Sequence, residues 1–226
     1  GGWCLDAVVT GTQNIGIGNN ALTTLTSGAN NIAIGQNAGD AISSSSGNTL
    51  VGNNAGSAIN TGNGENVCVG NNAGAVMTTG QQNVIIGDNA AAGAALTGSV
   101  NTVIGDNAGY AMTGASNGNT LIGAATGDAI TTGDNNTAVG AYALTEEDES
   151  SAITAIGYNA GNNHNGGTAN TMVGAYCADA VTTGTANTYV GDSCAGIATT
   201  GSGNCGFGHH ALSTLTTGAN NVGIGY

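Results

Sequence analysis

Residues 101–105 read Asn-Thr-Val-Ile-Gly, and the phrase returns as Asn-Thr-Leu-Ile-Gly at 119–123 and as Asn-Thr-Ala-Val-Gly at 136–140. Its glycine recurs every 17 or 18 residues, at Gly18, Gly35, Gly52, Gly70, Gly87, Gly105, Gly123, Gly140, Gly157, Gly174, Gly191, Gly208 and Gly225. A fixed period of this length is the signature of a repeat architecture. Positions within each unit are numbered here from this glycine, so that −1 is the residue before it.

The positions of the unit differ in chemistry. Position −1 is apolar in every unit, position −4 is Asn everywhere except at Ile153, and position +3 is almost always small. The alternation around −1 has the two-residue period of a strand, and the unit is too short for a βαβ crossover. The sequence therefore predicts an all-β fold, a parallel β-solenoid (β-roll) of 13 coils of 17–18 residues that forms one domain, residues 1–226. Asn side chains should hydrogen-bond from coil to coil.

The invariably apolar position −1 favours an interior assignment for −1 and −3, which places −2 on the surface. Position −2 nevertheless carries large apolar side chains in many units, and a contiguous apolar stripe marks an interface. The interface residues predicted along this stripe are Leu50, Ile85, Val103, Leu121, Met172 and Tyr189. The same assignment predicts that Asp at Val139 or Ile156 breaks the fold, whereas Asp at Asn63, in an inserted turn, is tolerated.

The composition excludes several classes of function. The chain has 13 acidic residues and no Lys or Arg, so it cannot neutralise phosphates, and we expect neither nucleic acid nor a membrane as partner. No catalytic Ser-His-Asp or Cys-His arrangement follows from the repeat positions, and we expect no enzymatic activity. Phrases such as Gly16-Ile17-Gly18-Asn19-Asn20-Ala21 mimic a dinucleotide motif but belong to the repeat, so no cofactor is expected.

Two clusters offer metal ligands, and neither has the spacing of a known site. His209 lies one coil after Asp192 at the same position, which leaves adventitious metal binding as an alternative. The acidic turn at residues 146–150 lacks the spacing of a calcium loop and is interpreted as a solvated loop. We therefore expect no metal site.

The five cysteines leave three alternatives open. Cys177 and Cys194 occupy the same position in adjacent coils, which would allow a disulfide along the stack. Cys194 and Cys205 lie in one coil at positions assigned to the interior, which would allow a disulfide across the core. The third alternative is that Cys replaces Ala as a small apolar side chain.

Two phrases carry a family resemblance: Asn-Thr-Ala-Val-Gly-Ala-Tyr-Ala-Leu at 136–144 and Thr-Thr-Gly-Ala-Asn-Asn-Val-Gly-Ile-Gly at 216–225. They resemble the 17-residue repeats of phage tail-fibre and related surface proteins and, more distantly, the head repeats of trimeric autotransporter adhesins, which are shorter. The resemblance covers the whole chain. It implies a left-handed β-roll, exposure on a surface and assembly into a trimer.

These observations predict a structural fibre or adhesin-shaft module, extracellular or on a virion or cell surface. Its partner would be a second copy of itself, met through the apolar stripe or end to end, with Tyr226 of one chain near Gly2 and Trp3 of the next. One alternative is a carbohydrate- or receptor-binding adhesin. The other is an ice-binding solenoid, which requires a flat face carrying Thr. The Thr residues at +8 and +9 are adjacent and straddle a turn, and those at −3 are assigned to the interior, so both observations argue against ice binding.

Overall fold

The computed structural model describes residues 4–7, 9–62, 64–146 and 149–226. It contains two compact units, residues 1–117 and 118–226, which are described one at a time. That the chain forms a single domain stays a prediction.

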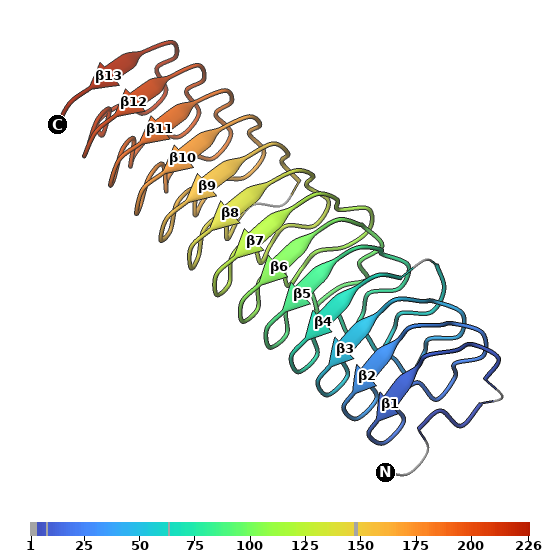
Figure 1. The fold of residues 1–226 in the computed structure, drawn as a ribbon. Coiled ribbons are helices and arrows are strands. Elements are labelled where there is room, and N and C mark those ends of the chain that lie inside the picture. The colour runs from blue at the N-terminus through green and yellow to red at the C-terminus, as the bar shows by residue number, and fades with distance from the viewer. Residues whose placement is uncertain (1–3, 8, 63, 147–148) are drawn as a thin grey trace. The chain divides into compact units, whose positions relative to one another are not determined.

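Three-residue strands are the regular elements of both units (Figure 1). The first unit contains β1 (Ile15–Ile17), β2 (Ile32–Ile34), β3 (Thr49–Val51), β4 (Val67–Val69), β5 (Val84–Ile86) and β6 (Thr102–Ile104). The second contains β7 (Thr120–Ile122), β8 (Thr137–Val139), β9 (Thr154–Ile156), β10 (Thr171–Val173), β11 (Thr188–Val190), β12 (Cys205–Phe207) and β13 (Val222–Ile224). The described residues include no helix, and hence none that could cross a lipid bilayer.

Strands one coil apart pair in parallel and in register, as Thr137 with Thr154 and Thr154 with Thr171. Within each unit they lie side by side in sequence order (Figure 1). The fold is thus a parallel β-solenoid of about twelve turns, which confirms the predicted fold class.

Positive φ angles shape each coil and explain its Asn and Gly content. In the coil of β8 the backbone has φ 58° at Asn135, 131° at Gly140, 59° at Tyr142 and 52° at Leu144. Asn and Gly adopt the left-handed region at the least cost. The repeated glycine must also be small, because a Cβ on Gly87 would lie 2.2 Å from the carbonyl oxygen of Gly105 in the next coil.

The interior combines small and large apolar side chains at fixed positions. Ala38 at +3, Ile42 at +7 and Leu50 at −2 are all fully buried. The α-carbon of Gly39 faces the side chains of Leu50 and Ile42, so that the two walls of the coil approach closely. Small residues at +3 and +4 therefore allow a closely packed core with few aromatic residues.

A ladder of buried Asn side chains at position −4 links successive coils. The Oδ1 atom of Asn187 accepts the backbone N–H of Asn204 at 2.9 Å, and its Nδ2 donates to the carbonyl of Gly201 at 2.9 Å. The same pair of bonds joins Asn66 to Asn83 and Gly80. The predicted Asn ladder is confirmed, and it satisfies backbone groups that would otherwise be buried without partners.

The predicted orientation of the strands is wrong. Leu121 and Ala138, at −2, are fully buried, whereas Ile122 and Ile156, at −1, are 36% and 39% exposed. The buried Asn at −4 and the residue at −2 share one face of the strand, so −3 and −1 must share the other. Val139 and Ile156 are therefore surface residues, and Asn63 lies outside the described residues.

Candidate functional site

The outward side chains of the strands form one continuous surface in each unit, here called the sheet face. It consists of positions −3 and −1, and each strand contributes two side chains. In the first unit these are Ile15, Ile17, Ile32, Ile34, Thr49, Val51, Val67, Val69, Val84, Ile86, Thr102 and Ile104. In the second they are Thr120, Ile122, Thr137, Val139, Thr154, Ile156, Thr171, Val173, Thr188, Val190, Cys205, Phe207, Val222 and Ile224. All are half-buried or exposed.

The sheet face carries no charge, although the chain has a net charge of −13. None of the acidic residues that the structure describes lies in a strand. Asp88, Asp106 and Asp192 come two residues after the last residue of their strands, and Glu65 comes two residues before the first residue of β4. A long, largely apolar surface bordered by carboxylates has the character of an interface.

The residues that the sequence predicted as an interface do not form one. Leu50, Ile85, Val103, Leu121, Met172 and Tyr189 are all fully buried in the core. The exposed columns hold β-branched residues in every strand except β12, which carries Cys205 and Phe207, and β-branched residues suit a sheet surface. The apolar stripe exists, but it belongs to the sheet face.

Of the two terminal residues predicted to form an interface, the structure describes Tyr226 but not Trp3. Tyr226 is 94% exposed, and its ring centroid lies 5.0 Å from that of His209. Trp3 lies outside the described residues, as does Gly2. An end-to-end contact between them stays a prediction.

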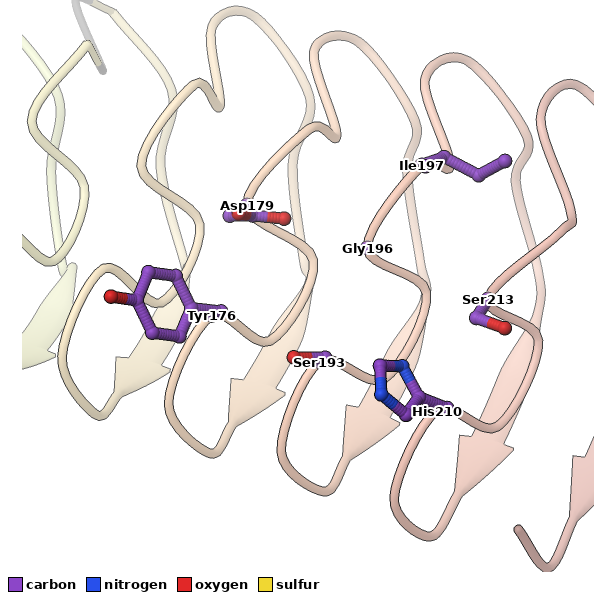
Figure 2. A pocket seen from close by; sticks show the side chains of 7 residues that line it. All are labelled: Tyr176, Asp179, Ser193, Gly196, Ile197, His210 and Ser213. Atoms are coloured by element: carbon purple, nitrogen blue, oxygen red, sulfur yellow. The ribbon is translucent and has the colours of Figure 1, made fainter.

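A hollow of about 330 Å³ lies on the surface of the second unit (Figure 2). Its lining consists of Tyr176, Asp179, Ser193, Gly196, Ile197, His210 and Ser213, which come from three consecutive coils. Tyr176, Ser193 and His210 follow one another at position +2, and Asp179, Gly196 and Ser213 follow one another at +5. Figure 2 shows Tyr176 at one end of the +2 row and His210 at the other.

The +2 position changes character between the units. In the first unit it is Asn in every coil of β1 to β6, and these side chains hydrogen-bond along the surface, as from Asn37 to Asn54 at 2.9 Å and from Asn54 to Asn72 at 3.0 Å. In the second unit it becomes Tyr142, Tyr176, Ser193 and His210 in four coils. These residues keep φ angles of 50–59°, a region that disfavours them relative to Asn.

Aromatic and acidic groups border the hollow. The ring of Tyr176 stacks edge-on against Tyr158, with centroids 5.3 Å apart, and Tyr158 stacks in the same way against Tyr142. Partial burial raises the pKa of the Asp179 carboxyl, while hydrogen bonds from backbone N–H groups, its own first and then that of Ala180, act in the opposite direction. Repeat numbering could have located this site, because Gly replaces a larger residue at +5 between two repeats that carry Tyr176 and His210 in place of Asn at +2.

The described residues contain no group of three or more His, Cys, Asp and Glu side chains placed to hold a metal ion. His209 Nε2 lies 3.7 Å from Asp192 Oδ1, so the predicted neighbourhood of these two residues is confirmed. The acidic turn at 146–150 includes residues 147 and 148, which are outside the described residues.

All five cysteines are free thiols in the structure. Cys205 lies at −3 on the sheet face, so a disulfide with the buried Cys194 is wrong. Cys177 and Cys194 do lie together in the core, where the neighbouring Cys194 thiol and burial raise the pKa of Cys177. The sulfur atoms of Cys177 and Cys194 each approach a backbone carbonyl oxygen at 3.3 Å, those of Tyr189 and Ala211. In this structure both serve as small core side chains.

The chain matches no protein-family model and no curated protein.

Proposed function

We propose that this protein is a structural module of a fibre whose copies associate side by side through the sheet face. The observation that supports the proposal is the uncharged, largely aliphatic surface formed by positions −3 and −1. The chain has 13 acidic residues and no Lys or Arg, and none of the acidic residues lies at these positions. Removing a surface of this kind from water stabilises the contact by about 25 cal/mol for each Å² of apolar area.

Charge supports a second copy of the chain as the occupant. Two copies with a net charge of −13 each repel one another, and the repulsion is smallest where no carboxylate is buried. The sheet face meets this condition, because Asp88, Asp106 and Asp192 would stay at the border of such a contact. Salt screens the remaining repulsion, so association should strengthen as the ionic strength rises.

The proposal is tested by placing charge on the sheet face. The double variant Ile122→Asp and Ile156→Asp adds two carboxylates to exposed positions of the second unit. Sedimentation velocity at high protein concentration should show oligomers or fibres for the unsubstituted protein and monomers for the variant. The control Ser57→Asp and Ala75→Asp adds the same charge at position +5 of the first unit and should assemble normally. Equal assembly of both variants would contradict the role of the sheet face.

Location on a virion or cell surface is part of the proposal and is supported by the resemblance of the repeats to those of phage tail-fibre and surface proteins. Electron microscopy of the native material is the direct test, because a surface fibre should appear as projections of constant width. Isolated particles free in solution would argue against this location.

Ice binding is the second candidate, and one observation favours it. Thr120, Thr137, Thr154, Thr171 and Thr188 point outward at −3 in successive strands, each two residues from an outward Ile or Val. The result is a regular array of hydroxyl and methyl groups repeating at about 4.8 Å, the spacing of strands. The sequence argued against ice binding because it placed these Thr residues in the interior, and that reason no longer holds.

The two candidates differ in what the monomer does. Thermal hysteresis and inhibition of ice recrystallisation should be absent if the sheet face serves assembly. If the protein instead remains monomeric and shows thermal hysteresis that Thr154→Leu and Thr171→Leu abolish, the fibre proposal is wrong and ice binding is correct.

A further inference from the structure

We propose that the hollow formed by Tyr176, Asp179, Ser193, Gly196, His210 and Ser213 binds an uncharged sugar residue of a glycan. This goes beyond assembly through the sheet face, since the residues at +2 and +5 lie in the turns that follow the strands. The ligand would fill a hollow of about 330 Å³, near the lower limit for small-molecule sites, which suits a single ring.

The hollow exists because one side chain is missing from a regular column. Gly196 is the one glycine at position +5, and all the other repeats carry a residue with a side chain there. It lies between Asp179 and Ser213 in the stack of coils (Figure 2). A Cβ on Gly196 would be 3.7 Å from Asp179 Oδ1, so the missing side chain leaves that carboxylate oxygen uncovered. The glycine is not required by the backbone, because its φ is not positive.

The lining offers the groups that a sugar uses. Tyr176 is 43% exposed and is held by its edge-on contact with Tyr158, so it presents a fixed aromatic surface for the C–H groups of a sugar ring. The Asp179 carboxylate accepts hydrogen bonds from hydroxyls, and the hydroxyls of Ser193 and Ser213 both donate and accept. The Ser193 hydroxyl already bonds Asp192 Oδ1 at 3.2 Å, which orients it.

The charge of the lining selects against anionic ligands, and its aromatic content does not suit a quaternary ammonium ligand. The chain has no Lys or Arg, so an anionic ligand would meet the Asp179 carboxylate without a fixed positive charge to offset it. A quaternary ammonium ligand is usually held by several aromatic faces, and Tyr176 is the single aromatic phenol or indole in the lining. The hydroxyl groups and the single carboxylate around the Tyr176 ring favour a neutral polyol.

Three residues of the lining adopt a backbone conformation that is unfavourable for their residue types. Tyr176, Ser193 and His210 occupy left-handed positions that Asn fills in the first unit, and they give up the surface Asn hydrogen bonds found there. Residues held in disfavoured backbone regions concentrate at binding sites. Three of these replacements, Tyr176, Ser193 and His210, border the hollow, whereas Tyr142 lies outside it.

The test is saturation-transfer difference NMR on the full chain with free glucose, galactose, mannose and N-acetylglucosamine, with N-acetylneuraminic acid and choline as charged probes. At least one neutral sugar should bind with a dissociation constant of about 1 mM, the range of weak single-site ligands. Gly196→Val, which fills the hollow, should weaken binding at least tenfold. Its matched control is Ala75→Val, at +5 of the first unit, which should leave binding unchanged.

Tyr176→Ala should also weaken binding at least tenfold, whereas Tyr142→Ala, at the same position outside the hollow, should not. Circular dichroism and thermal unfolding identify any variant that fails to fold. The proposal is overturned if no neutral sugar binds, if binding is the same in Gly196→Val, or if choline or N-acetylneuraminic acid binds more tightly. The sheet-face double variant should keep full sugar affinity, so this test and that of assembly fail independently.

Discussion

The ring of Tyr189 lies against the bare α-carbon of Gly206, its register partner in the next strand. A Cβ on Gly206 would come within 3.1 Å of Tyr189 Cδ1 and 2.8 Å of Cys194 Sγ. The core of a solenoid can therefore hold one large side chain at −2 when the next coil has none there. The missing side chain of Gly206 makes room for the Tyr189 ring at this buried position.

Gly206→Val should lower the free energy of unfolding by about 2 kcal/mol, because it overpacks a closed part of the core. Gly196→Val is the matched control, since its Cβ has room and the site is at the surface, and it should change stability by less than about 0.5 kcal/mol. Urea unfolding of both variants measures the difference. Comparable losses would show that the Tyr189–Gly206 pair is not tightly packed.

Leu121 and Ile122 are neighbours in β7 and should respond in opposite ways to Asp. Leu121→Asp puts an unpaired carboxylate in the core and should cost several kcal/mol, roughly 3–5. Ile122→Asp should cost the monomer less than about 1 kcal/mol, because its side chain already faces water. Thermal unfolding of the two variants under monomeric conditions tests the orientation of β7, and the reverse order would restore the orientation predicted from the sequence for this strand.

The repeat made the fold predictable but did not reveal which face of the strand is buried. Thirteen copies of one unit define the strand, the turn glycine and the Asn ladder, because stacking repeats each requirement in every coil. Orientation depends on which of two apolar columns has a core to pack against, and Ile34 and Leu50 look equally apolar in sequence. The buried Asn48 was the better guide: a ladder of amides that bonds backbone groups of the next coil fixes the inward face, and −2 shares that face.

The candidate sites were harder to predict than the fold for a related reason. The sheet face was predicted as a stripe at the wrong position because its apolar residues were taken as core. The hollow depends on the missing side chain of Gly196 at +5 and on the residues at +2 beside it. The stacking of the coils brings Tyr176 and His210 to its two ends.

Asn187→Ala should destabilise the second unit by about 3 kcal/mol. The change leaves the N–H of Asn204 and the carbonyl of Gly201 buried without these bonds, and each lost partner costs about 1–3 kcal/mol. Asn54→Gly is the comparison: it removes two amide–amide bonds on the surface but keeps the left-handed backbone favourable. Chemical unfolding should show a change below about 1 kcal/mol there, because water replaces the lost partners.

Cys68 should make stability fall at high pH. Burial raises its thiol pKa from 9.0 to about 12, so the folded state disfavours the thiolate that the unfolded chain forms. This contribution is fully present below about pH 9 and declines as the pH rises from about 9 towards 12. Comparing wild type with Cys68→Ala between about pH 8 and pH 11 isolates it, because the tyrosines titrate in both. A pH dependence equal in the two proteins would show that Cys68 is accessible to water in the folded state.

The rate at which the Cys205 thiol is modified should report whether the sheet face is covered. Its thiol lies at −3 of β12, half-exposed beside the outward Phe207, whereas Cys68, Cys177 and Cys194 are buried. In dilute, monomeric protein, N-ethylmaleimide at neutral pH should therefore modify Cys205 much faster than these three, because reaction requires an accessible thiolate. If copies associate through the sheet face, labelling of Cys205 should slow as the protein concentration or the ionic strength rises, and it should stay fast in the Ile122→Asp, Ile156→Asp variant. Mass spectrometry of the labelled peptides measures both rates. Association that leaves the Cys205 rate unchanged would place the contact between copies on another surface, and the sheet face would lose its assigned role.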